Sequence, residues 1–230
     1  MAKKKKDNTV SFATFLAELK SKAIEGPKPV ETKEEKKYFL IVSEGERTEP
    51  EYFNYFKKFL PKNFLDTVEV HGAGDNTINI VRQAINLKTQ RENDVLLPNY
   101  DECWAVFDKD DFPDQNFNSA VTLASQNSIG SAHSNQSFEL WYVLHFQYLN
   151  TCIHRSSYYK ILDKHLGFKY SKKSLKVVEY LFRNGNIEQA IEWAKTLELN
   201  SAGLSPSNSC PTTSVYKLVE SLRAYCLHDS

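Results

Sequence analysis

The chain has 230 residues, of which 41% are hydrophobic and 13% aromatic, enough for one sizeable core or for a core with a helical annex. Its 29 basic and 29 acidic side chains give a formal net charge of zero, which argues against tight binding of nucleic acid by bulk charge alone but not against a local basic face. No apolar run approaches the ~20 residues that span a bilayer, and no secretory signal follows the lysines at the start. We therefore expect a cytoplasmic protein without membrane contacts.

The cysteines give no sign of a metal site. The chain has four of them, far apart and without the paired spacing of zinc ligands: Cys103, Cys152, Cys210 and Cys226. Cys103 lies in the apolar run ECWAVF and is interpreted as a small buried hydrophobe. In the cytoplasm we expect the thiols to stay reduced.

Residues 1–36 are predicted to form an N-terminal arm. Lys3–Lys6 form a basic run, apolar residues between Phe12 and Leu19 have helical spacing, and Gly26 and Pro27 break that pattern. The lysine run is interpreted either as a solvated tail or as an arm that contacts phosphates.

From residue 37 the pattern changes to strands that alternate with helices. The continuous apolar run Tyr38–Val42 is typical of a strand buried on both faces of a parallel sheet. A helix is predicted next, with Thr48 as its N-cap, Glu51 closing a capping box and Pro61 ending it.

The later elements continue this alternation up to residue 150. We expect strands at 67–71, 103–107 and, with a weaker signal, 128–134, and helices from Asn76 or Thr77, at 118–126 and at 138–148. This order favours an α/β core over residues 37–150, with a parallel sheet and right-handed crossovers. Helices at 158–165, 175–182, 187–197 and 214–227 predict a helical C-terminal part, 151–230, packed on the core.

Acidic residues follow two of the predicted strands. Glu44 comes after YFLIVS, and Asp108 and Asp110 come at and beyond the end of CWAVF. Ligands collect at the carboxyl edge of an open parallel sheet, and two carboxylates two residues apart at an extended strand end can share one hard cation. Gly45 would allow a sharp turn and the close approach of a phosphate. Ordinary acidic turns are the alternative interpretation.

Two segments make the pattern more specific. LIVSEGERTE resembles the first motif of TOPRIM domains, and VFDKDD resembles their Asp-x-Asp motif. The whole chain is most similar to the RloB family of bacterial proteins, which is linked to restriction and abortive infection. Four segments carry this resemblance in family order: SEGERTEPEYF at 43–53, VFDKDDF at 106–112, SNQSFELWYVLHF at 134–146 and PTTSVYKLVESL at 211–222. The third departs from the family, which usually has Pro where this chain has Gln136.

The resemblance implies a TOPRIM-like core, a divalent cation (Mg²⁺ or Mn²⁺) and a nuclease active on DNA or RNA in defence against phage. It also implies an ATPase partner encoded nearby in some loci. Carried over to this chain, Asp108 and Asp110 would be metal ligands, and Glu44 would be a ligand or the general base. Glu139 would complete the metal site or instead interact with the N-terminus of its helix. The oligomeric state and the choice between DNA and RNA stay open.

Basic residues near these carboxylates are candidates for phosphate binding. Arg47 follows the Glu44 turn and could clamp a phosphate, and Lys109 could contact one unless it is merely exposed. Asp111 and Asp114 are interpreted either as residues that support the metal ligands without binding the metal or as loop residues.

Two histidines are weighed as acid–base groups. His133 lies in a polar stretch near a strand end and is a candidate, whereas His145 lies on an apolar helix and is interpreted as a core residue. No phosphate-binding loop of the GxxxxGK[ST] or GxGxxG type occurs, so any ATP would be used by a partner.

Two alternatives to a nuclease remain. A phosphatase with an Asp nucleophile is disfavoured, because VFDKDDF lacks the Thr or Val of that motif and comes late in the chain. A non-catalytic adaptor that binds a partner protein through its acidic edge would tolerate the loss of any single carboxylate.

Overall fold

The computed structural model describes residues 36–61, 68–72 and 76–225. The predicted arm therefore lies outside the described residues, apart from Lys36. Contacts place the described residues in one compact unit. The boundary expected near residue 150 stays a prediction. Among the described residues, no helix is long and apolar enough to cross a membrane.

The described elements follow the predicted alternation of strands and helices. In chain order they are β1 (Phe39–Ser43), α2 (Thr48–Phe56), a 3₁₀ turn (Lys57–Phe59), β2 (Val68–Gly72), α4 (Thr77–Glu92), β3 (Glu102–Asp108), α5 (Asp114–Gln126), β4 (Gly130–Ser134), α6 (Glu139–Leu144), α7 (Ser156–Leu166), α8 (Leu175–Asn184), α9 (Ile187–Asn200), a second 3₁₀ turn (Pro206–Asn208) and α10 (Val215–Arg223). The weak strand signal before residue 134 is thus confirmed as β4.

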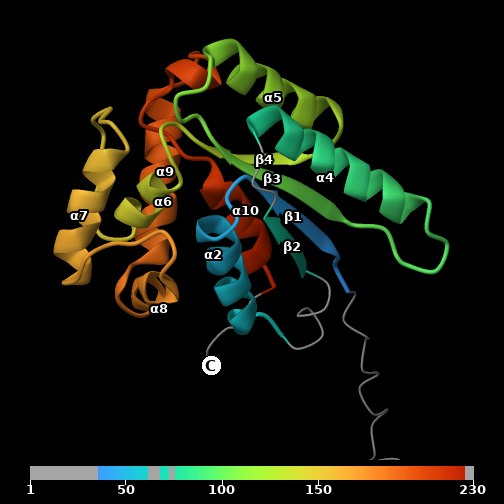
Figure 1. Cartoon of the computed structure of the whole chain (residues 1–230), viewed down its shortest axis with the longest axis horizontal. Coiled ribbons are helices and arrows are strands. Elements are labelled where there is room, and N and C mark those ends of the chain that lie inside the picture. The colour runs from blue at the N-terminus through green and yellow to red at the C-terminus, as the bar shows by residue number, and fades with distance from the viewer. Residues whose placement is uncertain (1–35, 62–67, 73–75, 226–230) are drawn as a thin grey trace, which may run out of the picture. The chain divides into compact units, whose positions relative to one another are not determined.

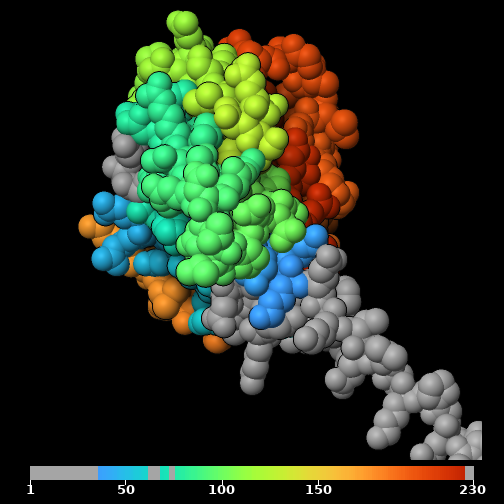
Figure 2. All heavy atoms as spheres, turned by 90° about the vertical axis from the view of Figure 1, so that its right-hand side faces the viewer, coloured from blue at the N-terminus to red at the C-terminus, as the bar shows by residue number. Residues whose placement is uncertain are grey.

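The four described strands form one parallel sheet in the order β2-β1-β3-β4. Leu40 and Val42 of β1 point into a core shared with α4 and α5, while Phe39 and Ile41 point into a larger core shared with α2, α10 and the later helices. Figure 1 shows the sheet between these layers, and Figure 2 shows α4 and α5 side by side on their face. A sheet buried on both faces explains the continuous apolar runs of its strands, and the predicted α/β fold is confirmed.

Several helix ends differ from the sequence-based expectation. Helix α2 ends at Phe56 and its 3₁₀ extension at Phe59, before Pro61, and α5 begins at Asp114 rather than near residue 118. Thr48 is the first residue of α2 rather than its cap, and no side chain caps this helix. The Thr48 hydroxyl instead donates to the carbonyl of Lys172 (3.3 Å), so tertiary contact replaces the predicted capping box. Helix α6 ends at Leu144, short of residue 148, and the carbonyl of the next residue, His145, accepts a hydrogen bond from Asn186 N–H (2.9 Å).

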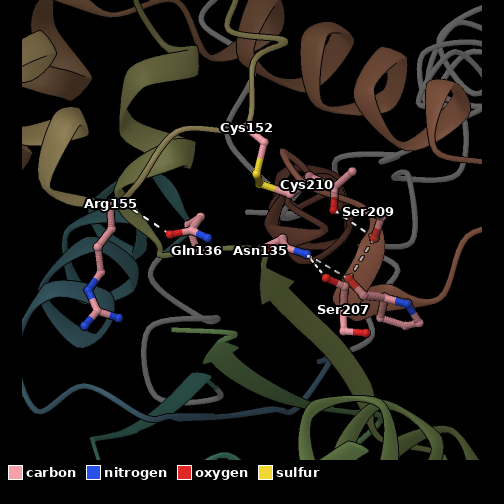
Figure 3. Close-up of a disulfide and its surroundings, with 9 residues drawn as sticks. Asn135, Gln136, Cys152, Arg155, Ser207, Ser209 and Cys210 are labelled. Atoms are coloured by element: carbon pink, nitrogen blue, oxygen red, sulfur yellow. Dashed lines mark hydrogen bonds between the residues drawn. A yellow bond between two sulfur atoms is a disulfide. The ribbon is translucent and has the colours of Figure 1, made fainter. Parts of the chain in front are cut away.

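The fourth family segment lies against the end of β4. Thr213 forms an antiparallel bridge with Ser134, and their hydroxyls are 2.9 Å apart. The Asn135 N–H donates to the carbonyl of Thr212 (2.8 Å), and the Asn135 amide donates to the carbonyls of Pro206 and Ser207 (Figure 3). The third and fourth segments therefore support one another at the edge of the sheet.

The expectation of reduced cysteines is wrong for two of the four. Cys152 and Cys210 form a disulfide, with their Cα atoms 5.2 Å apart, between loops separated by 58 residues (Figure 3). Tertiary packing brings these loops together, so their spacing in the sequence gave no signal. Cys103 is buried and free, as predicted.

Candidate active site

The predicted neighbours β1 and β3 do lie side by side. The Glu44 N–H donates to the carbonyl of Val106 (2.9 Å), which extends the β1–β3 ladder by one residue. The Asp108 N–H in turn donates to Glu44 Oε2 (3.2 Å). The carboxyl ends of the two strands therefore bring Glu44 and Asp108 together.

Asp108 and Asp110 do not share an extended strand end. β3 ends at Asp108, and Asp110 has a left-handed backbone with φ of 42°, a conformation that Asp adopts more easily than most residues. The Asp110 N–H donates to the carbonyl of Gln136 (3.1 Å), which holds this turn against the third family segment. Gln136 itself has φ of 81°, which a proline ring cannot adopt, so this turn excludes the Pro that is usual in the family.

Five carboxylates line one pocket of about 560 Å³: the exposed Glu46, and Glu44, Glu49, Asp108 and Glu139. Glu49 lies in the first turn of α2, and Glu139 is the first residue of α6. Three of these carboxylate residues are buried: the exposed fraction is 8% for Asp108, 5% for Glu49 and 0% for Glu139. The space beside Gly45 is filled by Glu49, because a Cβ at Gly45 would lie 2.1 Å from Glu49 Oε2.

The pocket disfavours negative charge in the absence of a cation. Burial, followed by the nearby charges of Asp110 and Glu49, raises the pKa of Glu44 to about 7. Burial and the charge of Glu139 raise the pKa of Glu49 to about 7. Burial and the neighbouring carboxylates raise the pKa of Asp108 well above its ordinary value, and burial raises that of Asp110.

Two basic side chains from beyond residue 150 reach this acidic edge. Lys172 Nζ lies 3.3 Å from Glu139 Oε1, which also accepts a hydrogen bond from the Tyr170 hydroxyl (2.8 Å). The Arg155 guanidinium contacts Asp110 Oδ1 (2.5 Å) and the exposed Asp111 (2.6 Å). Burial lowers the pKa of Lys172, but the Glu139 charge outweighs it and the pKa is raised.

The residues present fit a divalent cation. Four buried carboxylate oxygens make no hydrogen bond: Glu49 Oε2, Asp108 Oδ1, Asp110 Oδ1 and Glu139 Oε2. Of these, Asp110 Oδ1 is in an ion pair with Arg155. Oxygen donors that carry charge and lack partners are the ligands that Mg²⁺ and Mn²⁺ prefer. Among the described residues, however, no three acidic, His or Cys side chains already surround one point, so binding requires the carboxylates to rotate towards the ion.

The two predicted phosphate-binding residues, Arg47 and Lys109, lie in different environments. The Arg47 side chain lines the pocket, is 61% exposed, and lies 4.0 Å from Glu51, so it is available to a ligand. Lys109 is only 12% exposed at its side chain. Its ammonium donates to the carbonyl of Phe112 (2.5 Å) and contacts Asp114 (3.0 Å), so Lys109 stabilises the turn after β3. Lys109 is therefore neither exposed nor available to a phosphate, and neither expectation for it fits.

Neither histidine takes part in the pocket. His133 packs on the rings of Phe107 and Phe117, on the α5 side of the sheet, and burial lowers its pKa to about 4. His145 is buried, its Nδ1 lies 2.9 Å from the carbonyl of Trp141, and burial lowers its pKa to about 4. The interpretation of His145 as a core residue agrees with this packing, whereas His133 has no geometry for acid–base chemistry on a substrate in this pocket.

Sequence reasoning missed Glu49, Arg155 and Lys172. Glu49 lies in a helix start, where an acidic residue is ordinary, and only its five-residue distance from Glu44 could have drawn attention to it. Arg155 and Lys172 lie outside the family segments, and only the folding of the α7 region onto the strand ends brings them to the site.

We expect Glu49→Gln to stabilise the metal-free protein more at pH 7.5 than at pH 4.5. Because its folded pKa is about 7 and its ordinary value is 4.5, the native state binds more protons than the unfolded state in this window, and stability falls as pH rises through it. One pKa unit corresponds to about 1.4 kcal/mol, and each kcal/mol shifts Tm by about 2–4 °C in a chain of this size. The gain in Tm should therefore be larger at pH 7.5 by at least about 3 °C.

Thermal unfolding in EDTA measures this difference, with Glu92→Gln as the control. Glu92 is an exposed residue at the end of α4 far from the pocket, and its variant should follow wild type at both pH values. Adding Mn²⁺ should then raise the Tm of wild type more than that of Glu49→Gln. If the gain in Tm from Glu49→Gln did not change with pH, Glu49 would not be a buried carboxylate with a raised pKa in the metal-free protein.

One comparison with known proteins gives a match. A family model described as RloB-like protein matches residues 39–222, which include all four segments quoted above. No match is found among curated proteins or among solved structures. Because the family model covers most of the chain, the protein belongs to the RloB-like family.

Proposed function

We propose that this protein is a divalent-cation-dependent nuclease that hydrolyses phosphodiester bonds of DNA or RNA. The observation that carries the proposal is the convergence of Glu44, Glu49, Asp108 and Glu139 on one pocket at the carboxyl ends of adjacent parallel strands. Three of their buried oxygens lack hydrogen-bond partners, and a bound cation would satisfy them.

Asp108, Asp110 and Glu139 would hold Mg²⁺ or Mn²⁺, with Glu49 as an addition to the set expected from the sequence. A bound cation would supply neutralisation of the charge that develops on the scissile phosphate. Glu44 has one oxygen, Oε2, fixed by the Asp108 N–H, which leaves Oε1 to accept a proton from the attacking water. A pKa near 7 suits that role at neutral pH.

The basic side chains of the site have separable roles in this proposal. Arg47 is exposed at the mouth of the pocket and would bind a phosphate oxygen. Lys172 would neutralise Glu139 in the free protein and turn to the phosphate when a cation takes its place.

Family membership supports a role in bacterial defence against phage, with abortive infection as the outcome and an ATPase as partner in some loci. The chain has no GxxxxGK[ST] or GxGxxG loop, so an ATP-dependent trigger would come from the partner. The cytoplasm, where nucleic acid is accessible, is the proposed compartment, and the Cys152–Cys210 disulfide would be an exception to the reduced state of most cytoplasmic thiols.

A non-catalytic adaptor is the second candidate. It is favoured by the pairing of Arg155 with Asp110, which already neutralises part of the acidic edge, and by the lack of a ready-made cation site among the described residues. An adaptor would use the same edge to bind a basic surface of its partner.

Incubation of the purified chain with single- and double-stranded DNA and RNA, with Mg²⁺, Mn²⁺ or EDTA, tests the proposal. We expect cleavage of at least one substrate with either cation and none with EDTA. Cleavage that persists in EDTA would contradict the requirement for a divalent cation. No cleavage of any substrate, together with no cation binding by calorimetry, would remove the nuclease proposal and favour the adaptor.

A further inference from the structure

Basic residues are concentrated in one part of this otherwise neutral chain. Residues 155–176, which cover α7, the following loop and the start of α8, contain seven basic residues and one acidic residue, Asp163. The basic residues, called the α7 strip below, are Arg155, Lys160, Lys164, Lys169, Lys172, Lys173 and Lys176. Seven positive charges less one negative charge leave a local excess of six in a chain whose total charge is zero.

Five lysines of the strip are exposed and have no acidic partner. Lys160, Lys164, Lys169, Lys173 and Lys176 are all exposed, and none forms an ion pair with another residue in the described part of the chain. Elsewhere, lysines such as Lys37 and Lys217 are paired with carboxylates. Unpaired, closely spaced cations repel each other, which favours the binding of a polyanion.

The strip adjoins the carboxylate pocket at two places. Lys172 and Lys173 line the pocket itself, and Arg155, just before α7, contacts Asp110. Figure 1 shows α7 and α8 beyond the sheet on the side of α6, whose first residue, Glu139, belongs to the pocket. The positive surface therefore begins where the acidic site ends.

We infer that the α7 strip binds the phosphate backbone of the nucleic acid whose phosphodiester is hydrolysed in the adjoining pocket. The inference rests on the proposed function for the identity of that pocket. The 11 residues of α7 extend over ~16 Å, a length that corresponds to about five phosphates of one strand. Lys160 and Lys164, one turn apart on its exposed face, would contact phosphates away from the cleaved one.

The chemistry of the strip is that of backbone contact rather than base recognition. Its nearest aromatic rings are half-buried: Lys176 Nζ lies 4.0 Å from the ring centre of Phe168, and Lys172 Nζ lies 6.0 Å from that of Tyr159. Each of these two rings already has a lysine ammonium over it, which favours backbone contact over base stacking. The binding should be independent of sequence and strongly dependent on salt.

The test compares two triple variants of the full chain that remove the same charge. One replaces Lys160, Lys164 and Lys169 with Gln, all in the strip and outside the pocket. The control replaces three exposed basic residues elsewhere with Gln, namely Lys36, Lys58 and Arg82. Fluorescence anisotropy with a labelled DNA or RNA oligonucleotide in EDTA gives Kd at several salt concentrations without cleavage.

We expect the strip variant to bind at least about tenfold more weakly than wild type, with the slope of log K against log[salt] reduced by about 2 to 3. The control variant should stay within about twofold of wild type. Equal Kd values for the two variants, or no binding by wild type, would overturn the inference. So would a polyglutamate of matched charge that displaces the oligonucleotide as well as unlabelled oligonucleotide does, because the strip would then suit any acidic chain.

These outcomes are distinct from failure of the nuclease proposal, because binding is measured without a divalent cation. A chain that binds through the strip but never cleaves would refute the nuclease alone. A chain that cleaves with Mn²⁺ but binds equally well in both triple variants would refute the strip alone.

Discussion

Asp108→Asn should weaken Mn²⁺ binding by at least about 100-fold, beyond the 10–100-fold range typical of groups that only support a ligand. Asp108 is buried among Glu44, Glu49 and Glu139, and its Oδ1 has no hydrogen-bond partner. Asn has nearly the same shape but lacks the charge that a hard cation requires. Isothermal titration calorimetry at pH 7.5 measures the change, and nucleic-acid cleavage should fall with it.

Two comparisons separate this result from damage to the fold. Asp110→Asn should also weaken binding but by less, because Arg155 already neutralises that carboxylate. Glu92→Gln, at the far end of α4, should bind Mn²⁺ as wild type does. The Tm of Asp108→Asn in EDTA should rise or stay unchanged, because the substitution removes a negative charge that the neighbouring carboxylates repel. Equal Mn²⁺ affinity in wild type and Asp108→Asn would eliminate the metal site.

The arrangement of the sheet could be predicted because its signals are local. The runs around β1 and β3 are apolar over their whole length, as in parallel strands covered on both faces, and parallel strands end at the same edge. The proximity of Glu44 to Asp108 followed from that rule and from the order of the family segments. The α/β class needed no knowledge of side-chain packing.

The rest of the site depends on tertiary contacts that leave no local signal. Glu49 has the sequence context of an ordinary helix start, but packing under Gly45 buries it. Lys172 and Arg155 reach the site only because the helices after residue 150 fold back onto the strand ends. The left-handed turn at Asp110 replaced the extended geometry assumed for Asp-x-Asp.

The charge distribution shows the same limit of sequence reasoning. A net charge of zero argued against bulk attraction of nucleic acid, yet acidic and basic residues are segregated here into a pocket and the α7 strip beside it. A nucleic-acid strand bound across both surfaces would place one phosphate at the carboxylates, which would hold a cation, and the next phosphates at the lysines. The net charge of the whole chain does not reveal that an acidic and a basic surface lie next to each other.

Glu44→Gln should lower the rate of cleavage by at least about 100-fold while the fold is retained, the scale expected when a general base or a key charge is lost. Gln is nearly the same size, and its side-chain oxygen can still accept the hydrogen bond from the Asp108 N–H that positions Glu44. It cannot accept a proton from water at neutral pH. Single-turnover cleavage with Mn²⁺, from pH 5.5 to 8.5, measures the effect.

The pH profile separates a base from a passive charge. Because the pKa of Glu44 is about 7 without a cation, and a bound cation lowers it, the wild-type rate should rise with pH and level off at or below about pH 7. Glu44→Gln should lose that rise, and Glu92→Gln should keep it. If the chain acts against phage as proposed and does so as an enzyme, its effect on phage infection should disappear with Glu44→Gln. A folded Glu44→Gln protein that still protects cells would instead establish the adaptor, because an adaptor needs the surface of this pocket but not its chemistry.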